Sequence, residues 1–293
     1  MANEDLVSSG SVPNEQLNKE NLAAWDSVAE YWDQTLQNGN DMYEECLLPT
    51  VRELVGLSPD GPSLGLTGQR ALDLGTGSAV IAGELVKAGA TMTAADGSQG
   101  MLEKARWRSA MLGLDMVFDV VDLMDSESLD AFATRHSEKF DIITISMTLK
   151  ELADLNPLAR ALPKLLAPKG RVIIVNLHPV FSKPAGHRCI EVLENDETGK
   201  QELHRYIKVR RYLDIPPVRS EALRGQPKPL MLFHRPFWSV LEPFLQSGMV
   251  LDAMREPGFK GEPNGEQAAQ AQNYHNFQQF PMLLAFRLRL AGS

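Results

Sequence analysis

The chain has 293 residues, 43% hydrophobic and 23% charged, and its 29 basic and 38 acidic side chains give a formal net charge of −9. An acidic chain without a basic block argues against a nucleic-acid substrate, and two cysteines without metal or disulfide spacing indicate a reducing compartment. Because no apolar run approaches the ~20 residues of a membrane span and the N-terminus lacks a secretory signal, we expect a cytoplasmic protein with no membrane contact.

The N-terminal part of the chain is predicted to be helical after a polar start. Residues 1–19 are poor in large apolar groups and are expected to form a mobile tail. Apolar residues then recur at spacings of three and four from Leu22 to Trp32, which is typical of an amphipathic helix. A second helix is predicted over 45–57. Residues 20–60 are therefore expected to form N-terminal helices.

The next segment, residues 61–182, alternates between strand and helix patterns and is expected to be the core. The predicted strands are 70–75, 91–97, 115–122, 140–146 and 171–178. The predicted helices are 79–90, 98–113 (with Ser98 as N-cap), 126–136 and 157–170. Apolar strands that alternate with helices predict an α/β fold, a doubly wound Rossmann-like sheet covered on both faces.

The pattern changes after residue 182. Residues 183–233 are polar and rich in proline and glycine, and we expect an irregular lid with one or two edge strands. Residues 234–293 return to regular structure and are expected to complete the core sheet. They predict a helix over 236–248, a strand over 249–257 and a last strand over 280–290.

Acidic residues mark the ends of three predicted strands, and ligands bind beyond the carboxyl ends of such strands. These residues are Asp73, Asp96 and Asp122, while Ser146 ends a fourth strand. A carboxylate in the position of Asp96 suits a ribose diol, and one in the position of Asp122 can accept a hydrogen bond from an adenine amino group.

Two glycines, Gly75 and Gly77, follow Asp73 and permit a sharp turn with close approach of a ligand. The dinucleotide fingerprint needs a third glycine where Val80 stands, and Asp73 would repel a pyrophosphate. The pattern therefore favours a ligand with a ribose, an adenine-like base and a cationic end, which S-adenosylmethionine matches. A nicotinamide-dependent oxidoreductase remains an alternative.

The motifs together resemble the class I S-adenosylmethionine-dependent methyltransferases over roughly residues 70–180. The quoted segments are "LDLGTGSAV", "TAADGSQGMLEKA", "VVDLMD" and "LAPKGRVIIV". The segments "NLHPVF", "VRRYLD" and "FHRPFWSVLEPFLQSGMVLDAMREP" are similar to a subgroup that acts on small molecules. The family implies a seven-stranded, mostly parallel sheet whose last strand is antiparallel. The sequence departs from the family pattern at Ala79, where glycine is frequent, and at "SMTLKEL" after the fourth core strand.

The resemblance implies S-adenosyl-L-methionine as cofactor, S-adenosyl-L-homocysteine as its product, and no metal. The implied cofactor-binding residues are Asp73, Gly75, Thr76, Gly77, Asp96, Gly97, Met101, Asp122, Leu123 and Ser146. His178 is the candidate general base, and the alternative is that His178 and Pro179 shape a loop. The candidate substrate contacts are Tyr31, His234, Arg235 and Tyr274. We expect O-, N- or C-methylation of a small molecule by a monomer or homodimer, or else a methyltransferase-like protein that binds the cofactor without methyl transfer.

Overall fold

The computed structural model describes residues 5–6, 13–36, 39–58, 64–195, 197–223, 225–261 and 270–292. The helices are α1 (Asn14–Leu36), α2 (Leu48–Leu54), α3 (Val80–Lys87), α4 (Gln99–Leu112), α5 (Ser126–Arg135), α6 (Asn156–Leu165) and α7 (Phe237–Gln246). Shorter helical segments are η1 (Met42–Leu47), η2 (Leu149–Glu151) and η3 (Tyr274–Phe277). Among these described helices, none is both long and apolar enough to cross a membrane.

Seven strands form the main sheet, in the order β11-β12-β6-β5-β2-β3-β4. Their bounds are β2 (Arg70–Leu74), β3 (Thr91–Asp96), β4 (Val117–Val120), β5 (Phe140–Ser146), β6 (Leu166–Leu177), β11 (Met249–Arg255) and β12 (Leu283–Leu290). Neighbours from β4 to β6 pair in parallel, whereas β12 is antiparallel to both β6 and β11. The predicted fold class, including the antiparallel last strand, is confirmed.

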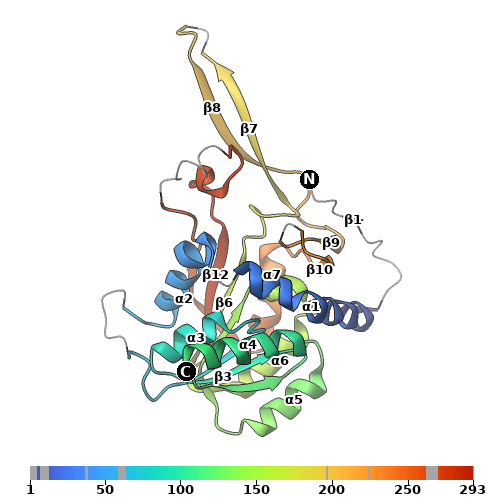
Figure 1. Ribbon diagram of the computed structural model, residues 1–293, viewed down its shortest axis with the longest axis vertical. Coiled ribbons are helices and arrows are strands. Elements are labelled where there is room, and N and C mark those ends of the chain that lie inside the picture. The colour runs from blue at the N-terminus through green and yellow to red at the C-terminus, as the bar shows by residue number, and fades with distance from the viewer. Residues whose placement is uncertain are drawn as a thin grey trace.

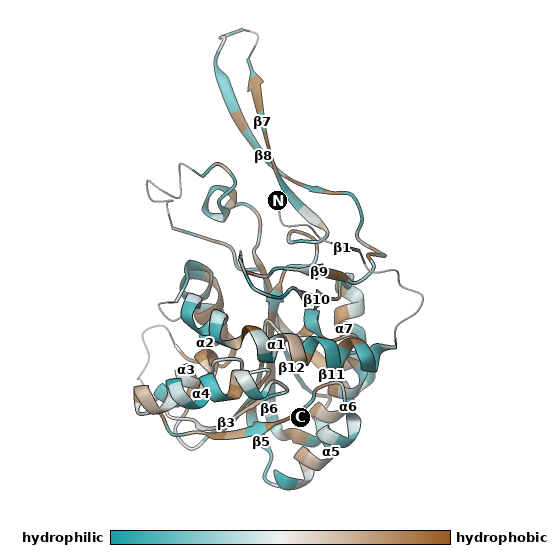
Figure 2. Cartoon of the chain, turned by 45° about the vertical axis from the view of Figure 1, so that its right-hand side comes forward, coloured by the Kyte–Doolittle hydropathy of each residue, from teal (hydrophilic) through white to brown (hydrophobic). Residues whose placement is uncertain are grey.

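The sheet carries an apolar core on each face, because successive strand residues point to opposite sides. On β6, Ile174 packs with α5, α6 and α7, whereas Ile173 packs with α2, α3 and α4. Figure 2 shows the strands largely in brown and the surrounding helices with much teal. Each fully buried large aliphatic or aromatic side chain, such as Phe132 or Leu85, stabilises this arrangement by roughly 1.5–3 kcal/mol.

Two predicted boundaries are corrected by the structure. Helix α1 begins at Asn14, inside the stretch that was expected to be a tail, while residues 1–4 and 7–12 lie outside the described residues. Helix α6 ends at Leu165 rather than continuing to Gly170, and β6 begins at Leu166. Pro168 lacks a backbone N–H and disfavours the helical conformation of the residue before it, so the helix stops short of the predicted turn.

The segment 183–233 contains more regular structure than an irregular lid. Strands β7 (Gly186–Glu194) and β8 (Gln201–Val209) form an antiparallel hairpin that projects away from the main sheet (Figure 1). Short strands β9 (Val218–Ser220) and β10 (Leu230–Leu232) pair with each other, and β9 also pairs with β1 (Asp5–Leu6). The prediction of one or two edge strands was therefore too low.

Candidate functional site

A cavity of about 590 Å³ lies at the carboxyl ends of β2, β3 and β5, within the range of 300–1,000 Å³ that is typical of ligand pockets. All the residues expected to bind the cofactor line it: Asp73, Gly75, Thr76, Gly77, Asp96, Gly97, Met101, Asp122, Leu123 and Ser146. The parallel topology explains this convergence, because the carboxyl ends of neighbouring strands meet at one edge.

The turn from β2 into α3 brings the backbone to the floor of this cavity. Gly75 and Gly77 have φ angles of 70° and 56°, which glycine adopts without strain. A Cβ atom on Gly75 would lie 2.4 Å from the Thr148 hydroxyl oxygen, so no side chain fits there. Ala79, at the departure from the family pattern, has a φ of 60°, which explains why glycine is favoured at that position.

Asp73 is a buried acid on the floor of the cavity. Its carboxylate accepts hydrogen bonds from the hydroxyls of Thr76 and Thr144, both at 2.7 Å, and the side chain is only 2% exposed. Burial outweighs these hydrogen bonds and raises the pKa of Asp73 to about 6. A bound cation would offset this burial penalty.

The other two strand-end acids are held by uncharged donors. Asp96 accepts backbone N–H bonds from Gly77 at 2.8 Å and Ser98 at 2.9 Å, and burial raises its pKa. Asp122 accepts a bond of 2.7 Å from the Asn18 amide. Within the described part of the chain, neither these two acids nor Asp73 makes an ion pair with a basic side chain. The three acids therefore retain a negative field that favours a cationic ligand.

Two further features mark the end of β5. The Ser146 hydroxyl is buried and makes no hydrogen bond within the described residues. The next residue, Met147, has a φ of 59°, a left-handed conformation that is strained for a residue with a side chain. Both residues line the cavity. An unpaired polar group beside local backbone strain is a common property of binding sites.

Helix α1 closes one side of the cavity, and both Asn21 and Trp25 line it. Asn21 donates to the backbone oxygens of Glu151 and Met231, each at 3.1 Å, and so fixes α1 against η2 and β10. Trp25 Nε1 donates to Glu151 at 2.5 Å, and burial raises the pKa of Glu151 to about 7. No spacing in the sequence distinguishes Glu151 from a surface acid, because its contact with Trp25 comes from a remote helix.

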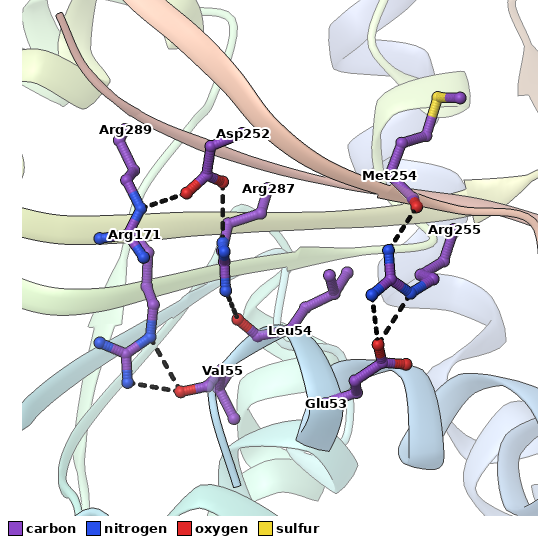
Figure 3. Close-up of polar contacts among 9 residues, drawn as sticks. All are labelled: Glu53, Leu54, Val55, Arg171, Asp252, Met254, Arg255, Arg287 and Arg289. Carbon is purple, nitrogen blue, oxygen red and sulfur yellow. Dashed lines mark hydrogen bonds and ion pairs between the residues drawn. The ribbon is translucent and has the colours of Figure 1, made fainter.

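The opposite wall comes from η1 and α2, which contribute Met42, Tyr43 and Leu48. Arginines from the sheet bind the carbonyl groups at the end of α2, where the helix dipole favours cations (Figure 3). Arg171 donates to the Val55 carbonyl at 2.9 Å, and Arg287 donates to that of Leu54 at 3.1 Å. These bonds fix α2, and with it the cavity wall, to β6 and β12.

His178 does not line this cavity. Its Nε2 lies 2.9 Å from a Glu256 carboxylate oxygen, and its Nδ1 accepts the backbone N–H of Val180 at 3.2 Å. The side chain is buried, and this burial lowers the pKa of His178. Because both ring nitrogens are engaged, the geometry gives no support to the expected general base and agrees with the loop-shaping alternative.

The predicted substrate contacts are not all brought together. Tyr274 lines the large cavity, and the Arg188 guanidinium lies 3.5 Å from its ring centroid. Tyr31 does not line it, whereas His234 and Arg235, together with His178, line a smaller neighbouring cavity. The Arg235 guanidinium instead donates to backbone carbonyls, including that of Leu149 at 3.1 Å, so its geometry is that of a structural brace.

Residues of metal-ligating type gather at another place. Ligand atoms of Asp41, Glu45 and His275 lie within 4.8 Å of one another, outside the lining of the large cavity. Glu45 and His275 are 2.8 Å apart, and this contact connects η1 to η3. We read the contact as an anchor for the cavity wall.

Comparison with known proteins agrees with this geometry. Residues 67–209 match the family model described as a methyltransferase domain. A ubiquinone biosynthesis O-methyltransferase of Pectobacterium atrosepticum is 26% identical over 166 residues, covering 55% of this chain and 66% of that protein. The same enzyme of Salmonella paratyphi A is 26% identical over 114 residues, covering 39% and 45% respectively. The matches thus span less than two thirds of either relative.

Solved structures extend the similarity of the fold. An S-adenosylmethionine-dependent methyltransferase from Mesorhizobium loti superposes with a TM-score of 0.58 at 21% identity, covering 86% of this chain and 99% of that one. Another from Clostridium acetobutylicum has a TM-score of 0.55 at 15% identity, with coverages of 92% and 99%. Residues 67–209 of the chain therefore carry a methyltransferase domain, and the fold is that of S-adenosylmethionine-dependent methyltransferases.

Proposed function

We propose that this protein transfers a methyl group from S-adenosylmethionine to a small-molecule acceptor. The observation that carries the proposal is the set of strand-end acids, Asp73, Asp96 and Asp122, which line one cavity without a basic partner in the described chain. A sulfonium with an attached ammonium group supplies the positive charge that such a cavity favours. The methyltransferase domain over residues 67–209 supports the same cofactor.

The cavity residues suit the separate parts of this cofactor. Asp96 has the position and the acceptor oxygens for a ribose diol, and Asp122 with Leu123 lies where an adenine ring would be held. Asp73 and the unpaired Ser146 hydroxyl are available to the charged end. The Gly75 turn leaves room for close approach of that end, since a side chain there would collide with Thr148.

When bound, the cofactor supplies a methyl group that the positive sulfur activates for in-line displacement. The protein's contribution is alignment of the acceptor and exclusion of water, and alignment can lower a barrier by roughly 7–11 kcal/mol. Helix α1 and segment η1 enclose the cavity from two sides. The wall between Met42, Met147 and Phe259 is apolar and suits an acceptor with an apolar body.

Glu151 is our candidate for the group that removes a proton from the acceptor. It lines the cavity, and burial raises its pKa to about 7, so the carboxylate can accept a proton near neutral pH. His178 has a positioning role in this proposal, because Glu256 and its own loop occupy both ring nitrogens.

Labelled S-adenosylmethionine incubated with the protein and a panel of hydroxyl, amine and acidic-carbon acceptors tests the activity. We expect methyl incorporation into one class, and its loss in Gly75→Ala. Tight cofactor binding without incorporation into any acceptor would favour the non-transferring alternative.

A further inference from the structure

A second, smaller cavity of about 60 Å³ lies at the end of β6, beside the large cavity. Both cavities are lined in part by Lys150, Leu177 and Ser182. Most of the remaining wall is apolar and includes Phe233 and Phe286. The two cavities therefore lie side by side and share part of one wall.

Asn176 is a buried amide that lines this smaller cavity. Its side chain is 9% exposed, and neither Nδ2 nor Oδ1 makes a hydrogen bond with a described residue. The positions before it on the same face of β6, Val172 and Ile174, are apolar and pack in the core. Because burial of an unpaired amide disfavours folding, stability alone does not explain an asparagine at this position.

The neighbouring polar groups differ in their hydrogen bonds. Ser182 donates its hydroxyl to the His178 carbonyl. The Arg235 guanidinium donates to the carbonyls of Leu149, Leu152 and Ala153. Lys150, in contrast, is half-buried, and its ammonium makes no hydrogen bond to any residue that the structure describes. Desolvation lowers the pKa of Lys150, while the charge of Glu151 opposes this. The Asn176 amide and the Lys150 ammonium thus retain hydrogen-bonding capacity.

We propose that Asn176 and Lys150 form a binding pair for a hydroxyl group of the methyl acceptor. A hydroxyl donates one hydrogen bond, here to Oδ1 of Asn176, and accepts two, here from Nδ2 and the Lys150 ammonium. A carboxylate has no hydrogen for Oδ1, and a methyl group satisfies neither amide atom. The apolar wall of the large cavity then takes the body of the molecule, so the substrate class is a hydroxylated apolar compound. This inference rests on the proposed methyltransferase function.

Phenol and toluene test the pair, because they share a shape and differ in the hydroxyl. We would titrate each, and benzoate, into ¹⁵N-asparagine-labelled protein with and without S-adenosylhomocysteine, following the Asn176 side-chain signal identified by its loss in Asn176→Leu. We expect phenol to shift this signal and to bind about tenfold more tightly than toluene. Asn176→Leu and Lys150→Met should each remove that preference while leaving toluene binding unchanged.

The same samples allow folding, through the melting temperature, and ligand binding to be measured separately. Asn176→Leu removes two unpaired buried polar atoms, so we expect its melting temperature without ligand to rise. Equal behaviour of phenol and toluene, including no binding by either, would overturn the pair, as would a preference for benzoate. Calorimetry with S-adenosylhomocysteine tests the methyltransferase proposal independently. If the protein prefers phenol but gives no heat with S-adenosylhomocysteine, only the methyltransferase proposal is contradicted. If it gives normal heat but shows no preference for phenol, only the pair is contradicted.

Discussion

Replacing Asp73 with asparagine should stabilise the ligand-free protein and weaken cofactor binding. Burial raises the pKa of Asp73 from 3.8 to about 6, a difference of roughly two units. At ~1.4 kcal/mol per unit, the ionised carboxylate destabilises the fold by ~3 kcal/mol at pH 7.5. Asparagine removes the charge but gives up a charge-assisted hydrogen bond to Thr76 or Thr144, worth ~1–2 kcal/mol. The net expected gain is therefore ~1–2 kcal/mol.

The pH dependence fixes the sign of this effect. An acid with a raised pKa in the folded state binds its proton more tightly there, so its contribution to stability is full below about pH 4. This contribution is lost as the pH rises through about 6. The difference in melting temperature between Asp73→Asn and wild type should therefore grow from pH 4.5 to pH 7.5, reaching a few degrees by differential scanning calorimetry.

Asp252→Asn is the matched control, because its effect on the melting temperature should have the opposite sign. Burial raises the pKa of Asp252, but hydrogen bonds from Arg287 and Arg289 more than compensate, so the pKa lies below its usual value (Figure 3). This variant should melt at a lower temperature than wild type at pH 7.5. If Asp73→Asn also lowers the melting temperature at pH 7.5, or if its effect is the same at both pH values, the burial argument is refuted.

Three other variants test separate parts of the site. Gly75→Ala places a Cβ against Thr148 at a positive φ. We therefore expect chemical denaturation to show a free energy of unfolding lower by roughly 2 kcal/mol or more, and we expect no measurable cofactor binding. Full stability and binding would contradict the turn geometry. Glu151→Gln should remove the rise in methylation rate that wild type shows as the pH passes through about 7, and an unchanged pH–rate profile would exclude Glu151 as the base. Burial lowers the pKa of His178, so its protonation disfavours the fold and the wild type should lose stability below about pH 6.5. His178→Gln should reduce this loss. A difference in melting temperature from wild type that is independent of pH would count against this.

The cofactor half of the site could be predicted because its positions follow from local sequence. A strand that ends at Asp96 and a helix capped by Ser98 place the acid at the sheet edge whatever the rest of the chain does. The same holds for the glycine turn after β2. Parallel pairing then brings these residues together, because the carboxyl ends of parallel strands meet at one edge of the sheet.

The acceptor half could not be predicted, because it depends on contacts between remote segments. Glu151 contacts Trp25 only in the folded protein, because 126 positions separate the two residues in the chain. Arg235 is of a residue type that often contacts substrates, yet its donors bind the backbone carbonyls of Leu149 in η2 and of two residues that follow η2. The unpaired amide of Asn176 likewise becomes visible only in the folded core.

Isothermal titration of the wild-type protein with S-adenosylmethionine, beside NADH, tests the central claim most directly. The acids of the large cavity predict clear heat with S-adenosylmethionine, a binding at least tenfold weaker in Asp73→Asn, and no heat with NADH. Binding of NADH without binding of S-adenosylmethionine would contradict the account.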